Sequence, residues 1–264
     1  MRGHIIIAAI LLACAIPASA ADEPAICADR PSKSTGPCTV PARNWQIETG
    51  LLDWSNNSSG GVHTELMQWG GSLIKYGLSA NADVELGIAP LEVLSVHGGG
   101  ANEHHSGFGD MFVRVKYALT QGDAPVQVAF NPFVKIPTAN HLLGNGKIEG
   151  GLLVPVQVPL GKSPLTLSLD PELDLVADTD GHGRHVATQE VVNVGVQLND
   201  KLSLSTEIWA AWDWDPAGTA KQASADGAIA YDLGKDVQVD AGANFGLNRN
   251  TPDVELYTGV SARF

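Results

Sequence analysis

Charged side chains that recur at every second position are the residues of this chain that could do chemistry. Residues two apart lie on the same face of a β-strand. Opposite charges held across a narrow aqueous passage create a transverse field, which orders water and sorts solutes by charge and dipole. We therefore predict that these residues line a solute path as field-setting groups, with no covalent role. They are Arg114, Lys116, Lys135, Asp170, Glu172 and Asp174.

The same charges allow a second interpretation. A barrel between the filled type of about 8 strands and the open type of about 16 has limited interior room, so its charges can pair and plug it. Lys135 can in particular be a structural cation that Asp110 on the adjacent strand satisfies. The acidic excess among the inward-facing residues predicts a mild preference for cations if a continuous pore exists. Both interpretations stay open on the sequence alone.

Enzymatic chemistry needs a nucleophile and its partners, and the sequence does not offer them. It contains no Gly-x-Ser-x-Gly elbow, and no Ser, His and acid fall on facing strand positions. His104, His105, His182 and His185 lie in expected external loops near acidic residues and could hold a divalent cation, but nothing fixes their approach. We predict no enzymatic activity, no metal and no cofactor. An outer-membrane barrel enzyme acting on lipid remains the alternative, which a phospholipid hydrolysis assay would reveal.

About twelve runs of alternating polarity must position these residues. Tight turns such as 199–201 alternate along the chain with longer polar connections such as 98–107. An even strand number with this asymmetry is typical of an outer-membrane barrel whose short turns and termini face the periplasm. Pro90 and the Gly70-Gly71 pair indicate bulges, so the facing of residues 44–97 is not assigned. The runs are 44–55, 63–78, 82–97, 108–120, 125–138, 150–160, 165–178, 186–198, 201–214, 221–233, 236–248 and 253–264.

The last run has one apolar face and one polar face, and it ends in an aromatic residue, Phe264. A C-terminal aromatic on such a strand resembles the assembly signal that the barrel insertion machinery of bacteria reads. No apolar run after residue 20 reaches the length of about 18 residues that a transmembrane helix needs. A closed barrel satisfies every backbone group within lipid. The fold expected is therefore all-β: a transmembrane antiparallel up-and-down β-barrel of about 12 strands in the bacterial outer membrane.

The N-terminal residues predict export. Arg2 precedes an apolar stretch, and Ala18-Ser19-Ala20 supplies small residues at a cleavage site, so residues 1–20 read as a signal peptide. A lipoprotein signal ending at Cys14 is the alternative. Residues 21–43 are expected to form a periplasmic N-terminal segment, and the sequence leaves open whether it folds into the lumen. An oxidising compartment favours a disulfide between Cys27 and Cys38. Two free thiols are the alternative to this disulfide. Residues 44–264 are expected to form the barrel.

Several short motifs resemble the outer-membrane family called MetA-pathway of phenol degradation, over roughly residues 44–264. The resemblance implies a β-barrel that passes small compounds, such as aromatic or hydrophobic ones. We therefore expect an outer-membrane channel or transporter that passes small molecules by passive diffusion through a charged lumen; a plugged structural barrel is the alternative. Its expected partners are outer-membrane lipid, the insertion machinery and a small-molecule solute, with no nucleic acid. The motifs are Gly107-Phe108-Gly109-Asp110, Val115-Lys116-Tyr117, Val134-Lys135-Ile136-Pro137-Thr138 and Leu143-Gly144-Asn145-Gly146.

Deletion of Phe264 is expected to impair membrane assembly more than it harms protein that is already inserted, because the residue acts as a recognition signal. The fraction of heat-modifiable, folded barrel in isolated outer membranes measures assembly. Phe264→Tyr keeps the aromatic ring and should assemble normally. Equal assembly of the deletion variant and the wild type would contradict the assignment of Phe264 as the signal.

Overall fold

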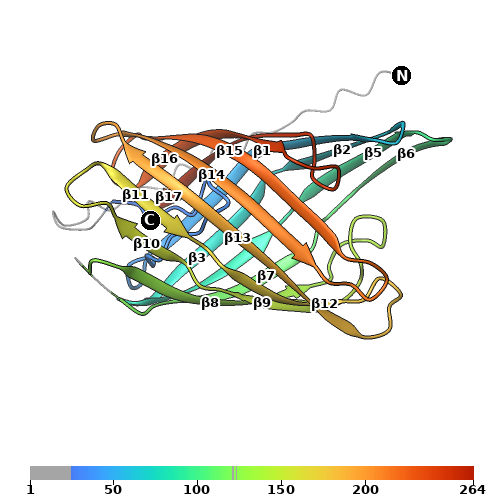
Figure 1. Cartoon of the computed structure of the whole chain (residues 1–264). Helices are drawn as coiled ribbons and strands as arrows, with labels where there is room; N and C mark the ends of the chain where they lie inside the picture. Colours follow the sequence, from blue (N-terminus) through green and yellow to red (C-terminus); the bar gives the residue numbers. More distant parts are fainter. Residues whose placement is uncertain (1–24, 121, 123) are drawn as a thin grey trace, which may run out of the picture.

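The computed structural model describes residues 25–120, 122 and 124–264. The predicted signal peptide lies outside the described residues and stays a prediction. Antiparallel strands form one sheet that closes into a barrel (Figure 1). Within the described part of the chain, no helix has the length and apolarity that crossing a membrane would require. The prediction of an all-β, twelve-stranded outer-membrane barrel is confirmed.

Seven of the twelve wall strands in the described chain are continuous, and five consist of two segments each. The continuous strands are β1 (Trp45–Ser59), β8 (Gln127–Ile136), β13 (Arg184–Gln197), β14 (Leu202–Asp213), β15 (Ala220–Asp232), β16 (Val237–Gly246) and β17 (Val254–Arg263). The two-segment strands are β2 (Val62–Trp69) with β3 (Gly71–Ser79), β4 (Ala82–Ile88) with β5 (Leu91–Gly98), β6 (Ala101–Gly107) with β7 (Met111–Ala118), β9 (Glu149–Leu153) with β10 (Val156–Pro159), and β11 (Leu165–Leu169) with β12 (Glu172–Ala177).

The first and last strands close the barrel. β1 pairs with β17 from Gln46 opposite Arg263 onward. At the end of this seam Phe264 N donates to the carbonyl of Trp45 at 2.8 Å, and Trp45 N donates to the carbonyl of Phe264 at 3.1 Å. Closure removes the free edge that an open sheet would expose to lipid.

Proline and glycine explain where the wall strands are interrupted. Gly70 has a φ of 69° and separates β2 from β3. Pro90, Pro155 and Pro171 fall in three of the other interruptions. A proline cannot donate a hydrogen bond to the ladder, so pairing stops at these positions. The bulge signals at Gly70 and Pro90 thus correspond to real breaks in the strands.

The apolar faces of the strands point outward and the polar faces point into the lumen. On β7 the side chains of Val113, Val115 and Tyr117 are exposed on the outer surface, whereas Lys116 is fully buried inside. The same inversion holds along β15 to β17, where serine, aspartate and asparagine are buried and isoleucine, leucine and phenylalanine are exposed. Hydrocarbon covers the outer surface of an outer-membrane barrel, so this distribution is the one expected of such a protein.

The connection at residues 98–107 differs from the loop that the sequence predicted. It is a strand hairpin, in which β6 pairs with β5 along its whole length. Ser95 contacts His104 Nδ1 at 3.0 Å, and His97 Nδ1 contacts Asn102 at 2.8 Å across it. The sequence prediction was wrong because this hairpin projects past the lipid-covered wall (Figure 1, upper right), where both faces meet water and polarity does not alternate.

Candidate functional site

Residues 25–43, called the plug segment here, lie inside the barrel at the end that carries the short turns and the C-terminus (Figure 1). Ile26 N donates to the carbonyl of Lys235 in a short turn at 2.8 Å. The predicted disulfide is present, with the Cα atoms of Cys27 and Cys38 6.1 Å apart. Arg43 N donates to the carbonyl of Gly77 at 2.8 Å, where the chain enters β1. Residues 25–43 of the predicted N-terminal segment therefore occupy the lumen at this end of the barrel, which the sequence left open.

Backbone N–H groups of the plug segment donate to carboxylates of the barrel wall. A carboxylate that accepts such bonds is compensated even though it is buried, and each bond also satisfies a donor of a segment that has no regular secondary structure. The wall therefore supplies hydrogen-bond acceptors to the plug segment, and the plug segment supplies donors to the buried carboxylates of the wall. The pairs are Asp29 and Arg30 with Glu48 (2.9 and 3.0 Å), Lys33 with Glu207 (2.8 Å), Thr35 with Asp170 (2.6 Å) and Val40 with Asp83 (2.8 Å).

A buried ion cluster fixes the plug segment to β1, β3, β4 and β7. Asp29 of the segment pairs with Lys75 at 2.6 Å and with Lys116 at 2.8 Å. Lys75 also pairs with Glu48 at 2.5 Å, and Lys116 pairs with Glu85 at 3.3 Å. The four wall side chains are essentially inaccessible to solvent. Removing one member would leave the others as uncompensated buried charges, which is strongly destabilising.

The protonation of Asp29 is set by this cluster. Burial disfavours its charged form, but the ammonium groups of Lys116 and Lys75 prevail and hold its pKa well below the usual range. A carboxyl with a lowered folded-state pKa contributes stability above its ordinary pKa and loses it only as the pH falls toward the lowered value. Asp29 therefore anchors the plug segment throughout the neutral and mildly acidic range.

Two of the three cations of the plug segment, Arg30 and Lys33, neutralise further wall carboxylates. The guanidinium of Arg30 pairs with Asp240 at 2.9 Å. The ammonium of Lys33 pairs with Asp226 at 2.9 Å and lies 5.5 Å from the ring centroid of Trp209. These pairs hold the segment against β14, β15 and β16, opposite the buried cluster. Its position is thus fixed from several sides of the lumen.

Glycine in the wall makes room for the plug segment. A Cβ atom at Gly77 would overlap the backbone carbonyls of Val40 and Pro41. A Cβ atom at Gly259 would overlap the guanidinium of Arg30. A larger residue at Gly77 would push the backbone of the segment away from the wall, and one at Gly259 would displace the side chain of Arg30.

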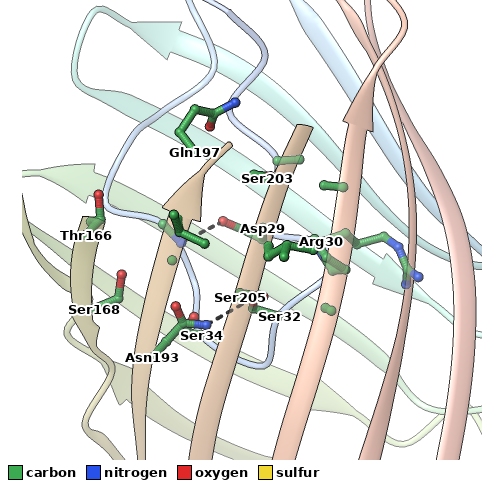
Figure 2. Close-up of a pocket in the computed structure, with 18 of the residues that line it drawn as sticks. Asp29, Arg30, Ser32, Ser34, Thr166, Ser168, Asn193, Gln197, Ser203 and Ser205 are labelled. Carbon is green, nitrogen blue, oxygen red and sulfur yellow. Dashed lines mark hydrogen bonds between the residues drawn. The ribbon is translucent and has the colours of Figure 1, made fainter. Parts of the chain in front are cut away.

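The plug segment divides the space in the lumen. On the short-turn side, a cavity of about 260 Å³ lies between the segment and strands β11, β13 and β14 (Figure 2). Its lining is mainly hydroxyl and amide groups, and Asn193 donates to Ser32 at 3.2 Å across it. The polar residues labelled there are Asp29, Arg30, Ser32, Ser34, Thr166, Ser168, Asn193, Gln197, Ser203 and Ser205.

Two further cavities border the plug segment, with volumes of about 440 and 390 Å³; we call the second the central cavity. Both are lined by Lys33 and Thr35 of the segment and by Phe112 and Arg114 of β7. The guanidinium carbon of Arg114 lies 5.9 Å from the ring centroids of both Phe112 and Phe133. Arg114 has no ion-pair partner within the described chain, and its buried Nε has no hydrogen-bond partner there. It is therefore a cation available to a solute.

The structure places the other sequence-predicted path residues in different surroundings. Lys116 belongs to the buried cluster under the plug segment. Lys135 pairs with Glu149 at 2.6 Å and with Asp110 at 3.4 Å, the partner that the sequence suggested. Asp170 binds Thr35 N and also borders the central cavity. Glu172 lines that cavity, and Asp174 lies two residues further along the same inward face of β12.

Sequence reasoning missed the wall residues that hold the plug segment from the first strands. Glu48, Lys75 and Glu85 lie on strands β1, β3 and β4, whose facing the sequence left unassigned. The available signal was the spacing of two between Gln46 and Glu48, which is the same spacing that identified the later inward residues.

The loop histidines do not form a metal centre in the structure. His185 contacts Asp178 at 2.7 Å through Nδ1 and Asp213 at 2.5 Å through Nε2. His104 and His105 lie on the β5–β6 hairpin instead. Among the described residues no group of histidine, cysteine and acidic side chains has a metal-binding arrangement.

Comparison with protein families gives a match over nearly the whole chain. The model of the family "Putative MetA-pathway of phenol degradation" matches residues 28–264. The chain belongs to this family. The match includes most of the plug segment, so the family pattern extends beyond the barrel wall into the lumen. No curated protein sequence is significantly similar to the chain.

Solved structures with the same fold are outer-membrane barrels. The translocator domain of the autotransporter NalP from Neisseria meningitidis has a TM-score of 0.52 and 13% identity, and the match covers 85% of this chain and 90% of that one. The KdgM porin in complex with disordered oligogalacturonate has a TM-score of 0.50 and 8% identity, over 84% and 99% of the two chains. At these identities the likeness concerns the fold, and it places this family member among bacterial outer-membrane barrels.

Replacing Lys75 with Met should destabilise the barrel by about 3–5 kcal/mol, because Asp29 and Glu48 would lose a buried counter-charge. Urea titration of the purified protein in detergent micelles gives the free energy of unfolding and so measures the change. The matched control is Lys147→Met, since Lys147 lies in an exposed loop. A Lys75→Met barrel as stable as the control would show that the cluster does not hold the plug segment in place.

Proposed function

We propose that the protein is a passive outer-membrane channel for small aromatic molecules that carry an acidic or phenolic oxygen. The observation that carries this proposal is the guanidinium of Arg114. It lies beside two neighbouring phenylalanine rings, 5.9 Å from each ring centroid, in a lumen where the other cations of the described chain are paired. A ring of the solute can stack on the aromatic faces or on the guanidinium plane while its oxygen accepts hydrogen bonds from Arg114.

The plug segment would set the size limit of such a channel. Asp29, Arg30, Ser32 and Thr35 line both the short-turn cavity and the 440 Å³ cavity. A solute that moves from one cavity to the other must therefore pass these residues. Because hydrogen bonds and ion pairs hold the segment, local displacement is costly and only small solutes should pass readily.

The comparisons support a channel of this kind. KdgM is a porin, and its structure was determined with an oligogalacturonate. The family name refers to phenol degradation, which agrees with aromatic solutes. Two alternatives make different predictions: a plugged structural barrel would show no solute-dependent permeability, and a lipid-modifying enzyme would hydrolyse phospholipid in detergent micelles.

Replacing Arg114 with Gln should lower the permeability of benzoate relative to sodium about fivefold, which corresponds to ~1 kcal/mol of lost cation–π and charge interaction. Reversal potentials in planar bilayers under a sodium benzoate gradient measure this ratio. Lys147→Gln removes the same charge from an exposed loop and should leave the ratio unchanged. If both variants reduced the ratio equally, Arg114 would have no specific role.

Removing the disulfide with Cys27→Ser and Cys38→Ser should increase single-channel conductance. The crosslink restricts the plug segment, and without it the segment has more conformations available to it. The wild type treated with a reducing agent should behave like the double variant. Conductance that stays the same after both treatments would show that the plug segment does not limit passage.

A further inference from the structure

A notch opens in the outer face of the wall where two neighbouring strands break at the same level. The breaks separate β9 from β10 and β11 from β12. Across them Val154 N donates to the carbonyl of Pro171 at 3.0 Å. Pro171 has no N–H group and cannot donate a hydrogen bond in return. The ladder is therefore weaker here than elsewhere between these two wall strands.

The notch has a volume of about 370 Å³, and its lining comes from both faces of the wall. Leu152, Leu173 and Trp212 belong to the outward-facing set of their strands. Glu172 and Gln189 belong to the inward-facing set, and both also line the central cavity. Only these two residues are shared, and they are paired in the ladder between β12 and β13, so this one residue pair separates the notch from the central cavity.

Glu190 places a carboxylate on the lipid side of this notch. It lies in the middle of β13, between the outward-facing Thr188 and Val192. Its Oε1 accepts a hydrogen bond from Asp170 N at 3.1 Å, and Ala210, a small residue, is directly opposite on β14. A carboxylate accepts up to about four hydrogen bonds, so acceptor capacity remains. Ionisable groups facing the apolar part of a membrane are costly and point to function.

We propose that the notch binds an uncharged, largely apolar small molecule with a hydrogen-bond donor, and that it passes such molecules between the bilayer and the lumen. The apolar side chains accept the hydrocarbon part from the lipid, and Glu190 accepts the hydrogen bond of a hydroxyl group. Gln189 and Glu172 then meet the hydroxyl on the lumen side. The proposal rests on the channel function for its second half, since the molecule is delivered to the central cavity.

Equilibrium dialysis of 1-naphthol against the full barrel in lipid nanodiscs tests the site, with naphthalene as a probe without a donor. Empty nanodiscs give the lipid background. Thr188→Phe fills the notch, and Ile229→Phe adds the same ring at an exposed, outward-facing position on β15 as the matched control. Glu190→Leu removes the acceptor.

Wild type and Ile229→Phe are expected to bind one 1-naphthol per barrel, and Thr188→Phe is expected to lose this binding. Glu190→Leu should weaken 1-naphthol binding at least tenfold, the loss expected for a hydrogen bond to a charged acceptor, and change naphthalene binding less than about twofold. Absence of saturable binding to the wild type would overturn the proposal, as when a lipid chain fills the notch. Equal binding by Thr188→Phe and Ile229→Phe would overturn it too.

Benzoate permeability is measured on the same variants to separate the two proposals. Thr188→Phe should leave it unchanged, because the notch is outside the path past Arg114. A wild-type barrel that binds 1-naphthol in the notch but passes no benzoate would support the binding site and contradict the channel. A barrel that passes benzoate but shows no difference between Thr188→Phe and Ile229→Phe would contradict the notch and leave the channel intact.

Discussion

The interaction on which the rest of the structure depends is the binding of plug-segment donors by carboxylates of the wall. A barrel that turns its apolar side chains to lipid must turn its polar ones inward, and here the inward set is rich in acids. Acids in a confined lumen repel one another and lack solvent. The backbone N–H groups of Asp29, Lys33 and Thr35, together with the cations of Arg30 and Lys33, compensate them. Wall and plug segment are therefore one electrostatic unit.

This arrangement determines which charged side chains of the lumen remain available to bind a solute. Most charges that alternate along the strands are used to hold the plug segment, as with Lys116 and Asp170, or to pair within the wall, as with Lys135. Arg114 differs because two aromatic rings lie beside it and no carboxylate of the described chain forms an ion pair with it. Fewer charged side chains of the lumen are thus available to a solute than the sequence pattern predicted. Among the described residues it combines the cation of Arg114, which has no ion-pair partner there, with aromatic surface and the acids of β12.

The wall could be predicted from sequence because alternating polarity in a strand places its polar side chains in the lumen and its apolar side chains toward lipid. Along β16 and β17 the inward and outward assignments follow from alternation, and the twelve strands could be counted from turn residues. The position of residues 25–43 could not be predicted in this way, since the segment has no periodicity and its partners are up to 210 residues away. Likewise the β5–β6 hairpin lacks alternation because water lies on both sides.

The direct continuity between the plug segment and β1 has a consequence for biogenesis. β1 is the strand whose pairing with β17 seals the cylinder, and Trp45 and Phe264 meet at the end of that seam. The polypeptide just before Trp45 thus enters the lumen directly beside the seam that completes the wall. A barrel sealed without the segment inside would leave these wall acids to water and dissolved ions, so filling the lumen during assembly favours the closed barrel.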